Sequence, residues 1–133
     1  MNDLFPQAES KPISVRQALI NVPDYQPPPD MSPRFKEYWE RAGQGGTMGS
    51  FSSSNRLTLE KPSPTLAKSE GYGGMYHPTE CRPLSSAERK RLSSFPDDFI
   101  FTDWKSCIER IGNAVPPLMT RAIALQIKAV MFD

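Results

Sequence analysis

The sequence has few of the residues on which secreted scaffolds, metal centres and membrane anchors depend. It contains two cysteines, Cys81 and Cys107, and one histidine, His77. Two cysteines make no disulfide framework, and neither they nor the histidine have the spacing of a metal site. The longest apolar stretches are too short and too interrupted to span a bilayer, and no segment resembles a signal peptide. The expected compartment is therefore a reducing cytoplasm, without membrane contact.

An excess of charge of one sign is also missing. Sixteen lysines and arginines accompany fifteen aspartates and glutamates, so the net charge of +1 indicates no particular partner. Residues 50–95 differ, because seven basic and four acidic residues give this stretch an excess of three positive charges. Such a local surface suits phosphate contacts, and an ordinary solvated face is the alternative interpretation.

Proline, in contrast, is abundant, with 14 residues, while the hydrophobic fraction is 38%. This composition indicates one domain with long irregular connections, or a part of a larger domain. Residues 1–12 have no apolar period and are interpreted as a loose leader. Residues 27–29 are three consecutive prolines, which form a spacer that joins no helix or sheet interior.

Local signals predict an α+β fold with a small mixed sheet, short helices and long loops. Ser14 and Ser32 are candidate helix N-caps, and Ser85 with Glu88 has the pattern of a capping box. Two short alternating segments rich in strand formers read as an edge hairpin or as loosely paired strands. Helices are expected near residues 14–20, 33–42, 86–94 and 117–131, and strands near residues 56–60 and 65–68.

The clearest predicted element is the C-terminal helix. Its apolar residues cover more than half of its circumference, so the helix needs partners on two or more sides. The rest of the chain has few strong elements to cover it, which indicates that one face rests on this chain and the other on an absent domain. The apolar residues are Leu118, Met119, Ala122, Ile123, Leu125, Ala129 and Val130.

Several stretches together resemble the DNA cytosine-5 methyltransferases. Residues 82–88 (Arg-Pro-Leu-Ser-Ser-Ala-Glu) and 92–99 (Leu-Ser-Ser-Phe-Pro-Asp-Asp-Phe) resemble the ninth conserved motif of this family. Residues 110–117 (Arg-Ile-Gly-Asn-Ala-Val-Pro-Pro) resemble the tenth motif, and residues 61–66 resemble the Thr-Leu part of the target-recognition region. Residues 14–19 resemble the segment after the eighth motif, so the resemblance covers almost the whole chain.

The resemblance implies a cofactor contact at the tenth motif. Asn113, Ala114 and Val115 would line the pocket for S-adenosylmethionine, with free backbone N–H groups at a helix start suited to polar ligand atoms. Gly112 is expected to permit a backbone turn that a side chain would forbid. The alternative is that Asn113 only caps the last helix.

The resemblance also implies DNA contacts. Thr65 and Leu66 would touch a phosphate and brace the DNA-reading loops, and the alternative is an ordinary pair of strand residues. Arg82 is interpreted mainly as scaffold, with a phosphate contact as its second role.

The residues that carry out the family's reaction do not occur in the sequence. Missing are the nucleophilic cysteine after a proline, the Glu-Asn-Val segment that holds the base, the Phe-x-Gly-x-Gly cofactor turn and the Gln-x-Arg-x-Arg string of the eighth motif. Cys81 follows a glutamate and Cys107 follows a serine, so neither has the context of the nucleophile. The sequence therefore predicts no catalytic residue and no metal ligand in this chain.

The expected organisation is a leader (1–12), a target-recognition domain (13–101), and a tenth-motif turn with its helix (102–133) that belongs to a Rossmann-like cofactor domain missing here. The expected partners are duplex DNA and a catalytic N-terminal portion, with self-association through the last helix when that portion is absent. S-adenosylmethionine would bind only together with the catalytic portion, and the chain alone would be inactive. A split subunit, a truncated product and an expressed fragment of a restriction–modification enzyme, in a bacterial or phage-host cytoplasm, all remain open. The competing hypothesis is a stand-alone DNA- or protein-binding remnant.

Overall fold

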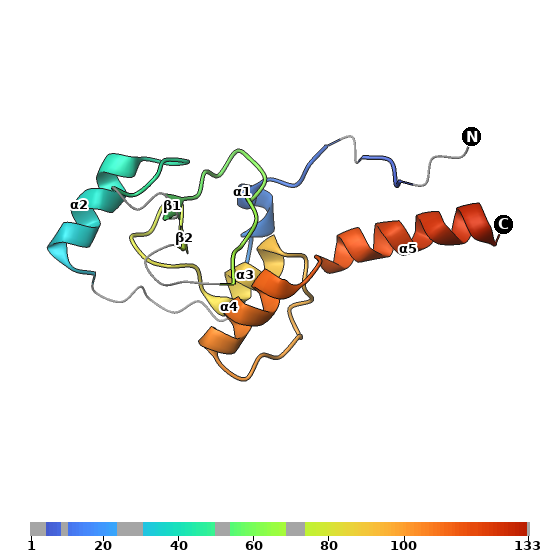
Figure 1. The fold of residues 1–133 in the computed structure, drawn as a ribbon. Helices are drawn as coiled ribbons and strands as arrows, with labels where there is room; N and C mark the ends of the chain where they lie inside the picture. Colours follow the sequence, from blue (N-terminus) through green and yellow to red (C-terminus); the bar gives the residue numbers. More distant parts are fainter. Residues whose placement is uncertain (1–4, 9–10, 24–30, 50–53, 69–73, 133) are drawn as a thin grey trace.

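The chain has five helices and one two-stranded sheet in the residues that the structure, a computed structural model, describes (Figure 1). The described residues are 5–8, 11–23, 31–49, 54–68 and 74–132. The elements are α1 (Val15–Ala18), α2 (Pro33–Ala42), β1 (Asn55–Arg56), β2 (Met75–Tyr76), α3 (Ser86–Leu92), α4 (Trp104–Asn113) and α5 (Pro117–Met131). This is the α+β class that the sequence predicts.

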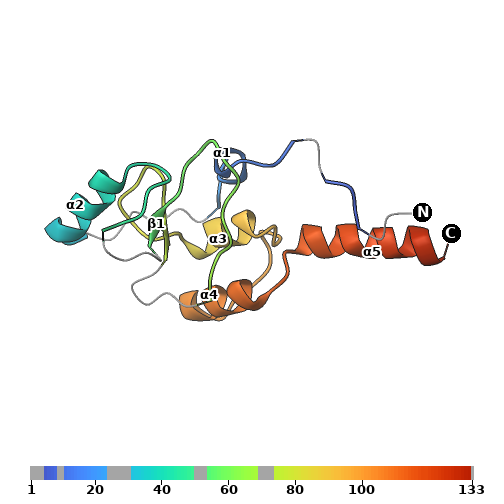
Figure 2. The same cartoon turned by 45° about the horizontal axis from the view of Figure 1, so that its top comes forward.

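The elements are arranged along one long direction. Helix α2 and the β1–β2 pair lie at one end, α1, α3 and α4 lie in the middle, and α5 projects from the other end (Figures 1 and 2). The small sheet and the central helices therefore form a body, and α5 extends beyond it.

The predicted caps start the helices as expected. The hydroxyl of Ser14 accepts the Gln17 N–H in a capping box, and the hydroxyl of Ser32 accepts the Phe35 N–H before a proline at the first helical turn. Helix α4 was not predicted, yet the Asp103 carboxylate accepts the Ser106 N–H at 2.7 Å and begins it.

The sheet differs from the prediction. Strand β1 pairs with β2 in parallel, with Asn55 opposite Met75, so the two segments form no hairpin. Residues 65–68 form no strand, and the partner strand instead comes from a stretch that reads as a loop in the sequence. Residues 67–68 instead lie against helix α4 at Gly112, and Pro64 before them has no N–H to donate to a ladder.

The buried core contains residues of α1 and α4 and of the segments between the elements. Ile111 and Cys107 of α4 lie in one buried cluster with Leu84, and α4 packs on α3. Residues on both sides of the predicted boundary between residues 101 and 102 therefore meet in this cluster, which contains no residue of α5, and the division into domains stays a prediction. The buried cluster comprises Val15, Leu57, Leu66, Leu84, Cys107 and Ile111.

Helix α5 rests on none of the other described elements. None of its residues is buried, and it packs against no other helix or strand in the described ranges. Its first turn is tied to the body by the Leu118 N–H, which donates to the Ser94 hydroxyl at 3.1 Å. The expectation that one of its faces rests on this chain is wrong, because the short connection after Asn113 directs the helix away from the core (Figure 2). No helix among the described residues is long and apolar enough to cross a membrane.

Gly112 is required for a different reason than the sequence suggests. It lies inside helix α4 and has no left-handed backbone, so it makes no special turn. A Cβ at this position would lie 2.2 Å from the backbone nitrogen of Lys68 and 2.7 Å from the carbonyl carbon of Ala67. Because Gly112 has no side chain, the backbone of residues 67–68 can pass directly against the backbone of α4. This contact holds the segment after Thr65 against α4.

Replacing Gly112 with alanine should lower the free energy of unfolding by about 3 kcal/mol, because the added methyl meets backbone that has no room to move. Denaturant unfolding measures this loss. The control is Glu109→Ala at an exposed position of the same helix, where the loss should stay within about 0.5 kcal/mol. A Gly112→Ala variant as stable as the wild type would contradict the crossing.

Candidate functional site

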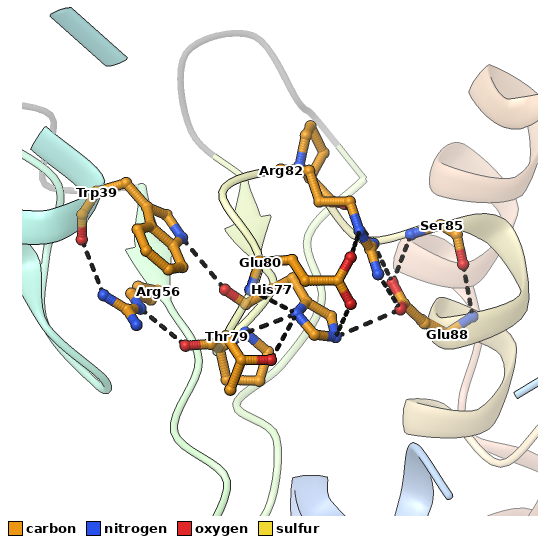
Figure 3. A network of polar contacts seen from close by, with 10 residues as sticks. Trp39, Arg56, His77, Thr79, Glu80, Arg82, Ser85 and Glu88 are labelled. Carbon is orange, nitrogen blue, oxygen red and sulfur yellow. Dashed lines mark hydrogen bonds and ion pairs between the residues drawn. The ribbon is translucent and has the colours of Figure 1, made fainter. Parts of the chain in front are cut away.

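A buried ion pair stabilises the body formed by the small sheet and the central helices. Arg82 donates from Nη1 to Glu88 Oε2 at 2.8 Å and from Nη2 to Glu88 Oε1 at 2.6 Å, a bidentate contact between two buried side chains (Figure 3). Arg82 also donates to Glu80 at 3.0 Å and to the Pro83 carbonyl at 3.0 Å. Glu88 in turn accepts the Ser85 N–H at 2.8 Å, which completes the predicted capping box of α3. One carboxylate thus joins the start of α3 to the turn after β2.

Both charges of this pair are held in place by their partners. Burial by itself would raise the pKa of Glu88, but the hydrogen bonds from Arg82 and from the Ser85 backbone outweigh it and lower that pKa. The hydrogen bond to Glu88 raises the pKa of Arg82 in spite of burial. The guanidinium is therefore engaged inside the body, as the scaffold interpretation of Arg82 expects.

His77 extends the network toward the sheet. Its Nδ1 accepts the backbone N–H of Glu80 at 3.0 Å and that of Thr79 at 3.3 Å, so the neutral ring carries its proton on Nε2. Nε2 faces Glu88 Oε1 at 3.5 Å. Burial lowers the pKa of His77 below its ordinary 6.5, with the Glu88 charge opposing the shift. The sequence alone indicates no partner for His77, because these partners are brought together by the folded turn.

The other end of the network fastens α2. Trp39 donates from its indole Nε1 to the His77 carbonyl at 3.2 Å. The guanidinium of Arg56 lies 3.4 Å from the Trp39 ring centre and donates to the carbonyls of Pro78 and Trp39. The whole set, from α2 through the sheet to α3, is visible as one chain of contacts in Figure 3.

The three predicted DNA-contact residues lie in different environments. Thr65 is exposed, Leu66 is buried in the core beside α4, and Arg82 is buried in the ion pair. The body thus presents Thr65 to solvent and uses its neighbour to fix the segment. DNA contact by any of the three stays a prediction.

The predicted cofactor residues surround the end of α4. Asn113 is its last residue, and the N-cap of α5 is Pro116 without a side-chain cap, so Asn113 does not cap the last helix. Asn113 and Ala114 line an open pocket of about 560 Å³, while Val115 is exposed next to it. Contact of these residues with a cofactor stays a prediction.

An aromatic cluster also lines this pocket. Phe95, Phe99 and Phe101 lie with ring centres 5.0 to 5.8 Å apart. Phe99 and Phe101 were missed as site residues, although a run of three aromatic side chains before the helix was the available signal. The lining of the pocket therefore combines apolar rings with the exposed amide of Asn113 and the charged side chains of Glu109 and Arg110.

Neither cysteine has an environment that favours a thiolate. Cys107 is fully buried in the core, and its Sγ lies 3.9 Å from the Ser86 carbonyl. Burial raises the pKa of Cys81, which opposes nucleophilic reactivity.

Comparison with known proteins shows the family. The family model for C-5 cytosine-specific DNA methylase matches residues 8–129. The type II methyltransferase M.AquIB of Picosynechococcus sp. is 32% identical over 119 residues, which cover 77% of this chain and 85% of that relative. The DNA (cytosine-5-)-methyltransferase M.ApeKI of Aeropyrum pernix is 35% identical over 131 residues, covering 95% of this chain and 26% of the relative.

The chain is thus a member of a DNA-modifying enzyme class. It belongs to the C-5 cytosine-specific DNA methylase family. It spans 19% and 43% of two further relatives, from Oceanobacillus iheyensis and Methanocaldococcus jannaschii, so it corresponds to a portion of their length. M.AquIB, in contrast, is itself a chain of similar length.

Replacing Glu88 with glutamine should cost about 3 kcal/mol of unfolding free energy, because the buried Arg82 charge keeps only the partly exposed Glu80 as its counter-ion. Chemical denaturation provides the measurement. Glu60→Gln is the matched control, since Glu60 pairs with Arg16 on the exposed surface, where the loss should stay within about 1 kcal/mol. Equal losses in the two variants would contradict the structural role of the pair.

The stability of the chain should fall as the pH is lowered from about 7 to 5. His77 has a folded pKa below its unfolded value of 6.5, so the unfolded state takes up a proton first as the pH falls. Glu88 adds a loss in the same direction at lower pH, as the pH falls below 4.5 through its depressed folded pKa. In His77→Asn the side-chain oxygen replaces the Nδ1 acceptor without titrating, so the pH 7 to 5 slope should flatten. An unchanged slope in thermal unfolding would refute this assignment.

Proposed function

We propose that this chain is the DNA-recognising portion of a DNA cytosine-5 methyltransferase, which transfers a methyl group from S-adenosylmethionine to C5 of cytosine in duplex DNA. The chain requires a catalytic N-terminal portion that carries the nucleophilic cysteine. The observation that carries the proposal is α5, an apolar helix of 15 residues that leaves the core directly after the tenth-motif turn and buries none of its residues. A helix of this kind needs a partner surface, and we take the catalytic portion of such an enzyme as that partner.

In the proposed enzyme the work is divided between the two portions. The catalytic portion takes the flipped cytosine into its pocket, while this chain reads the flanking duplex in the major groove. Thr65 is the exposed member of the predicted DNA-contact set, and we assign it to a backbone phosphate. Leu66 and Arg82 then act from inside the body, by fixing the segment that presents Thr65.

The pocket at the end of α4 suits one wall of a cofactor site. S-adenosylmethionine, when bound, supplies the methyl group. The exposed amide of Asn113 has both donors and an acceptor to offer a polar ligand, and the phenyl wall of Phe99 and Phe101 offers an apolar surface. Ala114 and Val115 continue the wall toward α5, so docking of α5 on the catalytic portion would close the pocket. Cofactor binding therefore belongs to the assembled enzyme, in the cytoplasm with the DNA.

The length of M.AquIB supports a separate chain of this size, since that methyltransferase is covered over 85% of its length. The competing hypothesis is a DNA- or protein-binding remnant without enzymatic role. The pocket at the end of α4 together with the exposed helix favours the first hypothesis, because a remnant without enzymatic role has no use for the wall of a cofactor site.

Mixing the chain with a separately expressed catalytic portion should restore transfer of labelled methyl groups to duplex DNA, while each part alone stays inactive. Leu125→Asp should abolish this restoration, because Leu125 is 52% exposed on α5 and its charge would enter the contact. The same substitution should leave the unfolding free energy within about 0.5 kcal/mol of wild type, since it lies outside the core.

In the absence of the catalytic portion, α5 should drive self-association that Leu125→Asp removes, as sedimentation would measure. Arg121→Gln on the same helix is the control for a change of charge alone. Methyl transfer by the chain alone, or full restoration by Leu125→Asp, would contradict the proposal.

A further inference from the structure

Helix α2 carries a preorganised pair of arginines on the face that it does not use for packing. Arg34 and Arg41 both lie over the ring of Tyr38, with their guanidinium carbons 5.6 and 5.1 Å from the ring centre. Arg34 also donates from Nε and Nη2 to the Tyr38 hydroxyl, both at 3.2 Å. Positions 34, 38 and 41 follow the helical period, so the three side chains share one face.

The tyrosine is supported from behind. The left-handed turn at Gly49 brings its backbone to the ring, because a Cβ there would lie 3.4 Å from Tyr38 Cδ1. The helix itself is fixed to the body by Trp39, which donates to the His77 carbonyl, and by Phe35, whose ring lies 5.0 Å from that of Tyr76. The arginine pair therefore has a defined position relative to the network of Figure 3.

The charge of the pair is weakly compensated. Arg41 is 3.9 Å from Glu37, at the outer limit of an ion pair, and the two side chains are 63% and 70% exposed. Exposed pairs of this kind contribute little. With Lys36 and Glu40 included, α2 carries three positive and two negative side chains. The helix thus offers an anion two guanidinium groups held beside one tyrosine ring, without a broad basic field.

We propose that Arg34 and Arg41, held over Tyr38, bind phosphates of duplex DNA that flanks the target cytosine. The planar guanidinium group matches the geometry of a phosphate, and stacking on an aromatic ring reduces the freedom that an arginine loses on binding. Figure 1 shows α2 and α5 at opposite ends of the folded structure. Because the proposed function gives α5 to the catalytic portion, α2 remains uncovered and reaches DNA away from the reaction centre.

Duplex DNA binding by the full chain, measured as a function of salt, tests this inference, which rests on the proposed function. Arg34→Gln with Arg41→Gln should reduce the salt slope by about two units, since each phosphate contact contributes about 0.9. Arg34→Lys with Arg41→Lys should keep the slope and weaken binding about fivefold, because lysine keeps the charge and loses the stack. Arg121→Gln with Lys128→Gln removes the same charge from α5 and should change neither quantity.

Variants of Tyr38 test whether DNA binding depends on the position of Arg34 and Arg41 or only on their charge. Tyr38→Leu should weaken DNA binding about as much as the double lysine variant, and Tyr38→Phe, which keeps the ring on Gly49, should weaken it less. Circular dichroism of each variant checks that α2 is still folded. Equal losses in the α2 and α5 charge variants, an unchanged affinity in Tyr38→Leu, or an equal effect on single-stranded RNA would overturn the inference. Absence of any salt-dependent DNA binding by the wild type would defeat the proposed function, and the inference with it.

Discussion

The arrangement of the small sheet and the central helices depends on the buried pair between Arg82 and Glu88. Two charges that leave water need excellent geometry to repay their desolvation, and here a bidentate contact and a backbone donor provide it. The pair ties the turn after β2 to the start of α3, α3 packs on α4, and α4 receives residues 67–68 at Gly112. The exposed Thr65 and the turn at Asn113 are therefore attached to the same rigid centre. A small body with very little sheet thus holds both of the segments for which DNA and cofactor contacts are predicted.

The sequence predicted the features that depend on local chemistry. Serine caps and prolines at helix starts are read directly from neighbouring residues, so α1, α2, α3 and α5 were found near their true positions. Features that depend on distant partners were missed. Strand β2 has two residues and pairs in parallel across a long connection, which leaves no local pattern. Helix α4 has a clear cap in Asp103, but the motif reading treated its residues as a turn, and Gly112 was explained by φ instead of by a close crossing.

The candidate site shows the same division. The order of the motifs located the cofactor turn and the Thr-Leu segment, and the structure adds that Thr65 is exposed while Leu66 and Arg82 are buried. Burial could not be read from the motif, because it depends on how residues 65–68 cross α4. His77, Phe99 and the two arginines over Tyr38 were outside the predicted site for a related reason. The residues that they contact can be identified only from the folded structure. Helix α5 was expected to rest partly on this chain and does not, which supports the proposal that its partner is the catalytic portion.

The central claim is that this chain supplies DNA recognition to a catalytic portion that supplies the chemistry. Sequencing of the methylated cytosines tests it most directly, with one catalytic portion combined first with this chain and then with a different recognition portion from the family. The account predicts that the set of methylated sites changes with the recognition chain, while the chemistry remains transfer to cytosine C5. Methylation of the same sites in both combinations, or by the catalytic portion alone, would contradict it.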